Sequence, residues 1–256
     1  MALLLAIAMP AMATEPVTPT PFTATYAVNY RGISAGKLNF QLRTDEQGRF
    51  IYETRAVPSL LARFLIGKKA IERSVMQIDG NGVSPITWFV EDGKRGSKRD
   101  GSLQFAWDEE RVRGVMEESR IDMPTEEGLQ DRLSIQIAVM TALLRSEEPG
   151  TIPIVDDDRI KYYNYTSAGN QKIKTGAGEF ETVIYHSSRQ GSKRLSRIWH
   201  APALGYLAVR AERIRKGKIE TVMELVDVHL DGAPLSIKKP PASVPGGDPD
   251  RLPPVE

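Results

Sequence analysis

The stretch FTATYAVNYRGISAGKLNFQLRT, residues 22–44, decides the class of fold. Apolar and polar residues alternate along most of its length, and Arg31-Gly32 separates two alternating runs. A period of two places successive side chains on opposite faces of a strand, and a short turn between two such runs lets them pair as a hairpin. The stretch therefore predicts two antiparallel strands, each with one apolar face.

Similar alternating runs recur toward the C-terminal part of the chain, separated by turn sequences such as DGNG at 79–82. The chain has 256 residues, of which 41% are hydrophobic, and this is enough for one sizeable core. We therefore expect a mainly β (α+β) domain over residues 22–230. It is expected to be a single strongly curved antiparallel sheet or partial barrel of about ten strands, with one long and one short covering helix.

Two segments depart from the period of two. Residues 129–144 predict a long helix, because apolar side chains recur there at three- and four-residue spacing, at Leu129, Leu133, Ile137, Met140 and Leu144. Residues 125–127, Thr-Glu-Glu, are expected to cap this helix and to supply an acidic first turn. The apolar segment PSLLARFLI at 58–66 predicts a short helix that begins at its proline.

The two ends of the chain differ from the domain in composition. Residues 1–13 combine an apolar run with Ala11-Met12-Ala13, which is typical of a signal peptide and its cleavage site, although no basic residue precedes the run. We therefore expect export to the periplasm, from a natural start upstream of the recorded one. Residues 14–21 form a Pro/Thr linker, and residues 231–256 form a Pro/Gly-rich tail that we expect to be disordered.

Export predicts that the mature chain begins near Thr14. The measurement is the N-terminal sequence, or the intact mass, of protein isolated from its native host. A chain that retains Met1 would contradict the signal peptide.

Composition excludes several classes of function. Lys and Arg number 34 and Asp and Glu 33, so the chain lacks the basic excess of a nucleic-acid-binding protein. There is no cysteine, which excludes disulfides, thiol catalysis and cysteine-ligated metals. The chain has no nucleophile elbow and no phosphate-binding loop, and its three histidines lack the spacing of a metal site. We expect no cofactor, no metal, no catalytic residue and no transmembrane segment.

Trp199 and His200 stand side by side in LSRIWHA, residues 195–201. In a strand their rings point to opposite faces of the sheet, so they cannot converge on one substrate. Trp199 is therefore interpreted as an architectural ring or as one wall of a cavity. Three consecutive acidic residues at 156–158 lack the alternation of a calcium loop and predict a solvated turn.

Two motifs resemble a family of proteobacterial envelope proteins known as a domain of unknown function, DUF3108. The first motif is matched by Tyr26, Val28, Tyr30, Gly32, Ile33, Ala35 and Gly36. The second is matched by Trp199, Ala201, Pro202, Leu207, Val209 and Arg210, and it departs from the family at Ala208, where proline is usual. The resemblance implies a periplasmic location and supplies no catalytic residues. A more distant analogy of fold is to lipoprotein carriers of the LolA/LolB type, which hold acyl chains between a sheet and helices.

These observations favour a periplasmic protein that binds an apolar or lipid-like ligand without catalysis. The candidate lining residues are Leu61, Phe64, Leu65, Trp88, Phe105, Trp107 and Trp199. Basic residues in two turns are candidates for contact with anionic headgroups or an acidic partner, namely Arg95, Lys98, Arg99, Arg189, Lys193 and Arg194. The alternatives are an envelope interaction protein with a packed core and a hydrolase or transferase. The oligomeric state is left open.

Overall fold

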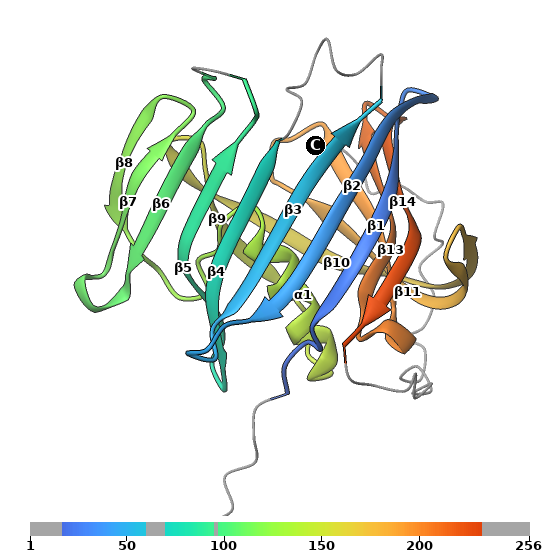
Figure 1. The fold of residues 1–256 in the computed structure, drawn as a ribbon, viewed down its shortest axis with the longest axis horizontal. Helices are drawn as coiled ribbons and strands as arrows, with labels where there is room; N and C mark the ends of the chain where they lie inside the picture. Colours follow the sequence, from blue (N-terminus) through green and yellow to red (C-terminus); the bar gives the residue numbers. More distant parts are fainter. Residues whose placement is uncertain (1–16, 60–69, 95–96, 232–256) are drawn as a thin grey trace, which may run out of the picture.

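The computed structural model describes residues 17–59, 70–94 and 97–231 (Figure 1). All fourteen strands belong to one sheet, in which every neighbouring pair is antiparallel. The first eight strands are β1 (Phe22–Tyr30), β2 (Ile33–Thr44), β3 (Phe50–Pro58), β4 (Ile71–Asp79), β5 (Gly82–Glu91), β6 (Gly101–Ala106), β7 (Arg111–Met116) and β8 (Ser119–Pro124). The other six are β9 (Thr151–Asp156), β10 (Arg159–Thr175), β11 (Gly178–Ser188), β12 (Arg194–Ala201), β13 (Leu207–Arg215) and β14 (Lys218–Leu230).

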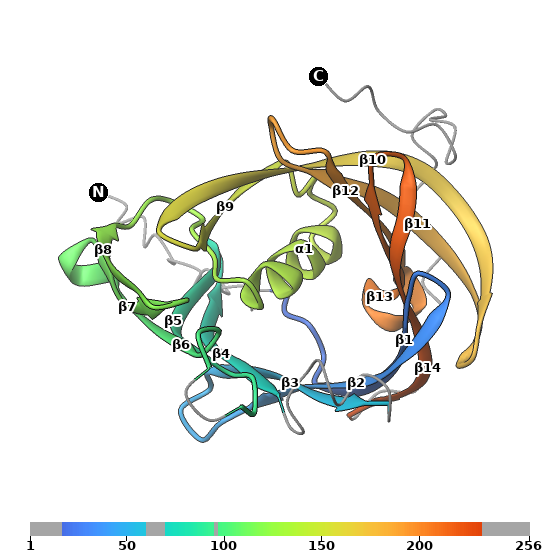
Figure 2. The ribbon, with the colours of Figure 1, turned by 90° about the horizontal axis from the view of Figure 1, so that it is seen from above.

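The sheet follows the chain with a single rearrangement. Its order is β8-β7-β6-β5-β4-β3-β2-β1-β14-β13-β12-β11-β10-β9, so two consecutive meanders meet where β1 pairs with β14. The sheet curls around the helix α1 (Ser134–Leu144), and its edge strands β8 and β9 are not paired with each other (Figure 2). The predicted β-rich class and the single curved antiparallel sheet are therefore confirmed.

The predicted number of about ten strands is too low. One reason is the turn at Glu117 and Glu118, which both adopt positive φ values of 50° and 67° and divide residues 111–124 into β7 and β8. Turns of this kind usually contain glycine or asparagine, and neither marks this one. A second reason is β9, whose short apolar run has no alternation.

The long helix is shorter and more enclosed than its sequence pattern indicates. It begins at Ser134, and Leu129–Leu133 precede it as a non-helical segment. Residues 125–127 do not cap it; the carboxylate of Asp131 accepts the backbone N–H groups of Leu133 and Ser134 at 2.7 Å each. The helix is buried on nearly all sides, because it lies inside the curved sheet rather than over one outer face.

The predicted short helix at 58–66 falls mostly on residues outside those that the structure describes. Its first residue, Pro58, is the last residue of β3. The described residues contain two short 3₁₀ helices elsewhere, η2 (Trp107–Glu109) and η3 (Pro202–Leu204). In the described part of the chain, no helix is long and apolar enough to cross a membrane.

Antiparallel pairing assigns every turn to one of two ends of the sheet. The turns that follow β1, β5, β7, β9, β11 and β13 lie at the same end, which is uppermost in Figure 1 and is called the upper end below. The turns that follow β2, β4, β6, β10 and β12 lie at the opposite, lower end. The C-terminal end of α1 points to the lower end, because Arg145 donates to the carbonyl oxygens of Asp79 and Gly80 in the turn after β4.

The buried cap makes stability depend on pH. Burial raises the pKa of Asp131 to about 6, against an ordinary value of 3.8. The neutral form is thus favoured by folding, so the stability that it contributes is present below pH 3.8 and is lost as pH rises through about 6. For the wild type, we expect the free energy of unfolding to fall by on the order of 2–3 kcal/mol over this window. Asp131→Asn stays neutral and keeps an acceptor oxygen, so we expect this fall to be absent in the variant.

The measurement is urea unfolding at several pH values between 3.8 and 6. The exposed Asp108→Asn is the control and is expected to keep the wild-type slope. Parallel curves for the wild type and Asp131→Asn would contradict the assignment.

Candidate functional site

A cavity of about 660 Å³ lies between α1 and the concave face of the sheet. The inward side chains of β1 to β5 form one wall, and those of β12 to β14 form the opposite wall. One side of α1 closes it through Leu133, Gln136, Val139 and Met140. The cavity is therefore built by strands that are distant in sequence and neighbouring in space.

The deep part of the cavity is mainly apolar. Its walls include Tyr26, Leu38, Phe40, Tyr52, Trp88, Leu207 and Met223. Two of the tyrosines place their hydroxyl groups on protein acceptors, since Tyr26 donates to the carbonyl of Ala208 at 2.7 Å and Tyr52 donates to Gln136 at 3.1 Å. Burial raises the pKa of both tyrosines, so both phenol groups are neutral at neutral pH.

The mouth of the cavity lies at the upper end and is charged. Arg99, Glu117 and Arg213 line it there and are exposed, whereas the lining residues nearer the lower end, such as Leu207 and His200, are buried. A cavity with apolar walls and a charged mouth is suited to an amphipathic molecule, with its apolar part inside and its polar group at the opening.

Glu72 places a carboxylate on the cavity wall. It lies on β4 and accepts a hydrogen bond of 2.8 Å from the indole nitrogen of Trp88. Burial raises its pKa, and the nearby charge of Asp131 acts in the same direction. A carboxyl group in this position accepts hydrogen bonds when it is ionised and can also donate one when it is protonated.

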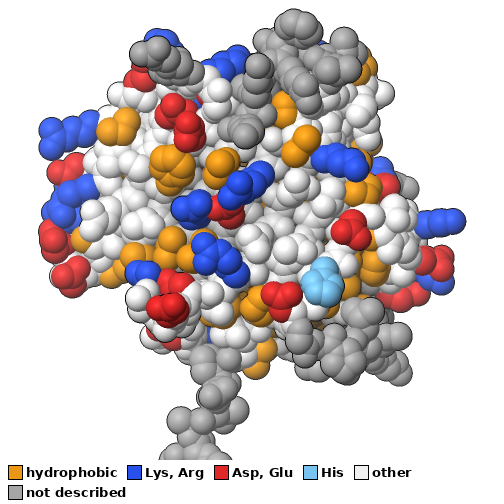
Figure 3. Space-filling view, in the orientation of Figure 1, with side chains coloured by type: hydrophobic (Ala, Val, Ile, Leu, Met, Phe, Trp, Pro, Cys, Tyr) orange, Lys and Arg blue, Asp and Glu red, His pale blue; other side chains and the backbone are white. Residues whose placement is uncertain are grey.

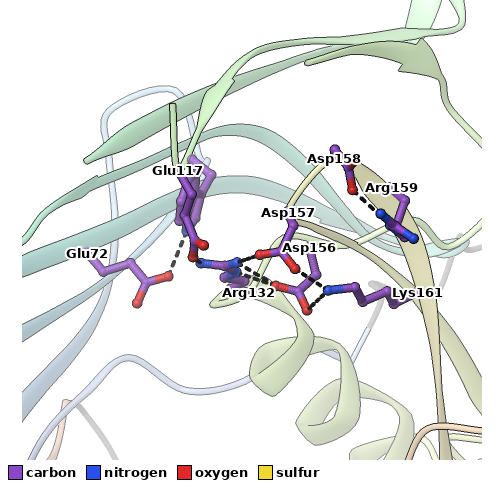
Figure 4. A network of polar contacts seen from close by, with 9 residues as sticks. Glu72, Glu117, Arg132, Asp156, Asp157, Asp158, Arg159 and Lys161 are labelled. Atoms are coloured by element: carbon purple, nitrogen blue, oxygen red, sulfur yellow. Dashed lines mark hydrogen bonds and ion pairs between the residues drawn. The ribbon is translucent and has the colours of Figure 1, made fainter. Parts of the chain in front are cut away.

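Arg132 joins the cavity mouth to both edges of the sheet, near β8 and at β9 (Figure 4). Its guanidinium group binds Glu117 in the turn after β7 at 2.8 Å. It also binds Asp156 and Asp157, at the end of β9, at 2.6 and 2.8 Å. Lys161 of β10 pairs with the same two aspartates. The acidic residues at 156–158 thus form a turn, as predicted, and their carboxylates are ion-paired.

His200 faces the cavity and Trp199 does not. The imidazole Nδ1 of His200 lies 2.9 Å from the carbonyl oxygen of Tyr206, to which it donates as a neutral ring, and Nε2 has no hydrogen-bond partner among the described residues. Burial lowers the pKa of His200 to about 4, so the ring is neutral at physiological pH. The unprotonated Nε2 is therefore an acceptor without a partner, and the atom itself is buried.

Trp199 lies on the outer face of the sheet and is buried beneath the β10–β11 hairpin. Its indole N–H donates to the side-chain oxygen of Gln171 on β10 at 2.8 Å. The guanidinium groups of Arg197 and Arg210 lie 5.1 and 5.6 Å from its ring centroid, and both bind the buried Glu212. Trp199 is thus an architectural ring that fixes the hairpin to the sheet.

The other predicted lining residues are dispersed. Trp88 lines the cavity. Phe105 and Trp107 stack on each other near the lower end of β6, and neither lines the cavity. Leu61, Phe64 and Leu65 lie outside the described residues, as does the predicted basic residue Arg95.

The five predicted basic residues that the structure describes lie in or directly beside two turns at the upper end. Lys98 pairs with Glu118 at 2.9 Å, and Arg99 lines the cavity mouth. Arg189 and Lys193 lie in the turn after β11, and Arg194 is the first residue of β12. The two turns share one end of the sheet.

The sequence prediction missed Glu72 and Arg132. Glu72 had a usable signal, because it is in phase with Ser74, Met76 and Ile78, which all point into the core. A charged residue in an inward register is unusual unless it has a partner or a function. Arg132 had no such signal, because its partners come from turns that are distant in sequence.

In the described part of the chain, no three histidine or acidic side chains are grouped as metal ligands would be.

The fold and the cavity define a barrel-like protein with one open, strongly curved sheet, a helix inside it and a ligand-sized space beside that helix. The chain belongs to the family of proteins of unknown function DUF3108, whose model matches residues 25–225. The predicted family is therefore confirmed.

Solved structures share the general architecture at low similarity. A β-barrel-like DUF1849 protein from Brucella abortus is 8% identical, with 85% of this chain and 100% of that chain covered and a TM-score of 0.49. A proposed lipoprotein from Parabacteroides distasonis is 11% identical, with 84% and 97% covered and a TM-score of 0.37. A chain of the MucA/MucB complex of Pseudomonas aeruginosa is 11% identical, with 84% and 53% covered and a TM-score of 0.36.

A search of curated proteins finds no match to the sequence. The structural similarities are too low to carry an argument about what this chain binds or where it acts.

The ion pairs of Arg132 predict a measurable contribution to stability. Its side chain is 27% exposed and contacts three carboxylates, so we expect Arg132→Met to lower the free energy of unfolding by about 2 kcal/mol. The matched control is Arg159→Met, because Arg159 is 67% exposed and pairs with Asp158 alone, so its loss is expected to leave the urea midpoint nearly unchanged. Equal urea midpoints for the two variants would contradict a role of Arg132 in connecting the two edges of the sheet.

Proposed function

We propose that this protein is an exported, periplasmic binding protein that holds an apolar or lipid-like ligand in the cavity beside α1, without catalysis. The observation that carries the proposal is the cavity itself, about 660 Å³ with mainly apolar walls. Protein interiors are normally close-packed, and ligand sites are typically about 300–1,000 Å³ in volume. A space of this size therefore has the dimensions of a ligand site rather than of a packing defect.

The distribution of polar groups supports an amphipathic ligand, such as an acyl chain with a polar head. An acyl chain fits the apolar walls, where exclusion of water from the hydrocarbon stabilises the complex. A polar or anionic head would lie at the mouth, beside Arg99, Arg132 and Arg213. The analogy with LolA/LolB-type carriers belongs to this proposal and rests on fold alone.

The N-terminal sequence supports the location. Residues 1–13 have the apolar run and small-residue site of a signal peptide. The absence of cysteine is compatible with an oxidising compartment. An apolar ligand that must cross an aqueous compartment between membranes requires a protein to shield it from water.

The test is native mass spectrometry of protein purified from the periplasm without detergent. We expect a mass excess that solvent extraction removes and that added fatty acid or phospholipid restores. An apo mass with no uptake of either lipid would overturn the proposal and favour the interaction protein with a packed interior. Release of hydrolysed lipid during uptake would favour the hydrolase.

A cavity-filling variant locates the ligand. Ala56 of β3 lines the cavity, so Ala56→Trp should abolish the mass excess by occupying the space. Its neighbour Val57 points outward and is 48% exposed, so Val57→Trp is the matched control and should retain the ligand. Circular dichroism checks that both variants are folded. Retention of the ligand by folded Ala56→Trp would place the ligand elsewhere.

A further inference from the structure

Three neighbouring hairpin tips form a continuous edge at the upper end of the sheet. They are the turns after β1, β11 and β13, on strands that are consecutive in the order β2-β1-β14-β13-β12-β11. Backbone hydrogen bonds join them, from Arg31 N–H to the carbonyl of Glu220 at 2.8 Å and from Lys216 N–H to the carbonyl of Lys193 at 3.2 Å. The positions of the three tips are therefore fixed relative to one another.

These tips carry an excess of positive charge. Their exposed basic residues, called the basic rim below, are Arg31, Lys193, Arg194, Arg215, Lys216 and Lys218. Arg31 pairs with Glu220 at 2.9 Å, and its hydrogen bond lowers the pKa of that carboxyl group. In the described part of the chain, the other five form no ion pair. By contrast, the outer face seen in Figure 3 intersperses basic with acidic side chains.

Large apolar side chains accompany the basic rim. Ile33 is 62% exposed, Tyr30 48% and Ile219 46%, and they lie at or beside the tips of the β1–β2 and β13–β14 hairpins. Tyr30 pairs with Ile33 across the first hairpin, and the guanidinium group of Arg31 lies 5.1 Å from the Tyr30 ring centroid. Apolar tips surrounded by cations are the combination that binds at the interface of a bilayer with anionic headgroups.

We propose that the basic rim docks the protein on an anionic lipid bilayer, with Tyr30, Ile33 and Ile219 entering the headgroup region. The mouth of the cavity lies at the same end, with Arg213 of β13 between the mouth and the rim. Docking would therefore turn the mouth toward the membrane, so that a lipid-like ligand can transfer without crossing water. The transfer rests on the proposed function, whereas the docking does not.

The shape of the surface favours a bilayer over an acidic protein. The charges lie on hairpin tips that project from one end of the sheet, and the apolar side chains lie at the ends of hairpins rather than in a groove. A partner protein usually requires a complementary packed patch, whereas a fluid headgroup layer adapts to separate projecting side chains.

The test is vesicle flotation with the full chain. We expect flotation with vesicles of phosphatidylglycerol and phosphatidylethanolamine and none with phosphatidylcholine alone. Binding should weaken as salt rises from about 0.1 M to about 1 M, where the screening length falls from about 10 Å to about 3 Å. The triple variant Lys193→Glu, Lys216→Glu and Lys218→Glu should bind anionic vesicles at least about tenfold more weakly.

A control variant has the same change in net charge away from the rim. Arg43→Glu, Lys172→Glu and Lys174→Glu alter exposed residues toward the lower end, and this variant should float as the wild type does. Ile33→Ser with Ile219→Ser leaves the charge unchanged and should reduce flotation at high salt. No flotation of the wild type, equal flotation with neutral vesicles, or equal loss in both charge variants would overturn the proposal. Capture of an acidic protein without vesicle binding would also overturn it.

Two readouts separate this proposal from the cavity proposal. The triple rim variant should retain its ligand in native mass spectrometry while failing to float. Ala56→Trp should float while lacking the ligand. A wild-type protein that floats but carries and takes up no lipid would leave docking intact and remove the cavity function, and the converse result would remove docking alone.

Discussion

Five residues before α1 connect the two unpaired edges of the sheet. The backbone of Gln130 pairs with β9, through the carbonyl of Pro153 and the N–H of Val155, while its side-chain amide donates to the carbonyl of Val83 on β5. The next residue, Asp131, accepts a hydrogen bond from Ser74 on β4 at 2.6 Å. Arg132 then binds carboxylates beyond β7 and at the end of β9. Strand pairing leaves this gap open, and a short segment of buried polar contacts spans it.

This connection also determines where empty space remains. It fixes the N-terminal end of α1 near β4 and β5, and the side of the helix that carries Ile135, Val139 and Leu143 packs on β9 to β11. The helix therefore fills only part of the interior. The remaining space, facing β1 to β3 and β12 to β14, becomes the cavity. Because close packing is the rule for protein interiors, the position of one helix accounts for the space on which the functional proposal depends.

The sequence was sufficient for the class of fold because alternation is a local property. The stretch at 22–44 and the hairpin signal at 79–82 both became antiparallel hairpins. The pattern failed where long-range contacts decide the conformation. Leu129 and Leu133 have helical spacing, yet Gln130 between them is held extended by its pairing with β9. At the cavity, the predicted candidate Trp88 lies on the wall because its position in the strand points inward, whereas Arg132 acquires its partners only in the folded chain.

The two buried carboxylates near α1 have different explanations. Asp131 satisfies the first N–H groups of the helix, so its burial is explained by the structure of the helix terminus. Glu72 has no such task. Its carboxylate accepts one hydrogen bond from the indole N–H of Trp88, and burial raises its pKa, so folding disfavours its charged form. A well-packed apolar residue at an inward position of β4 would stabilise the sheet more. Its place on the wall of the cavity, within the field of Arg132, puts this carboxyl group where the polar part of the ligand proposed above could reach it.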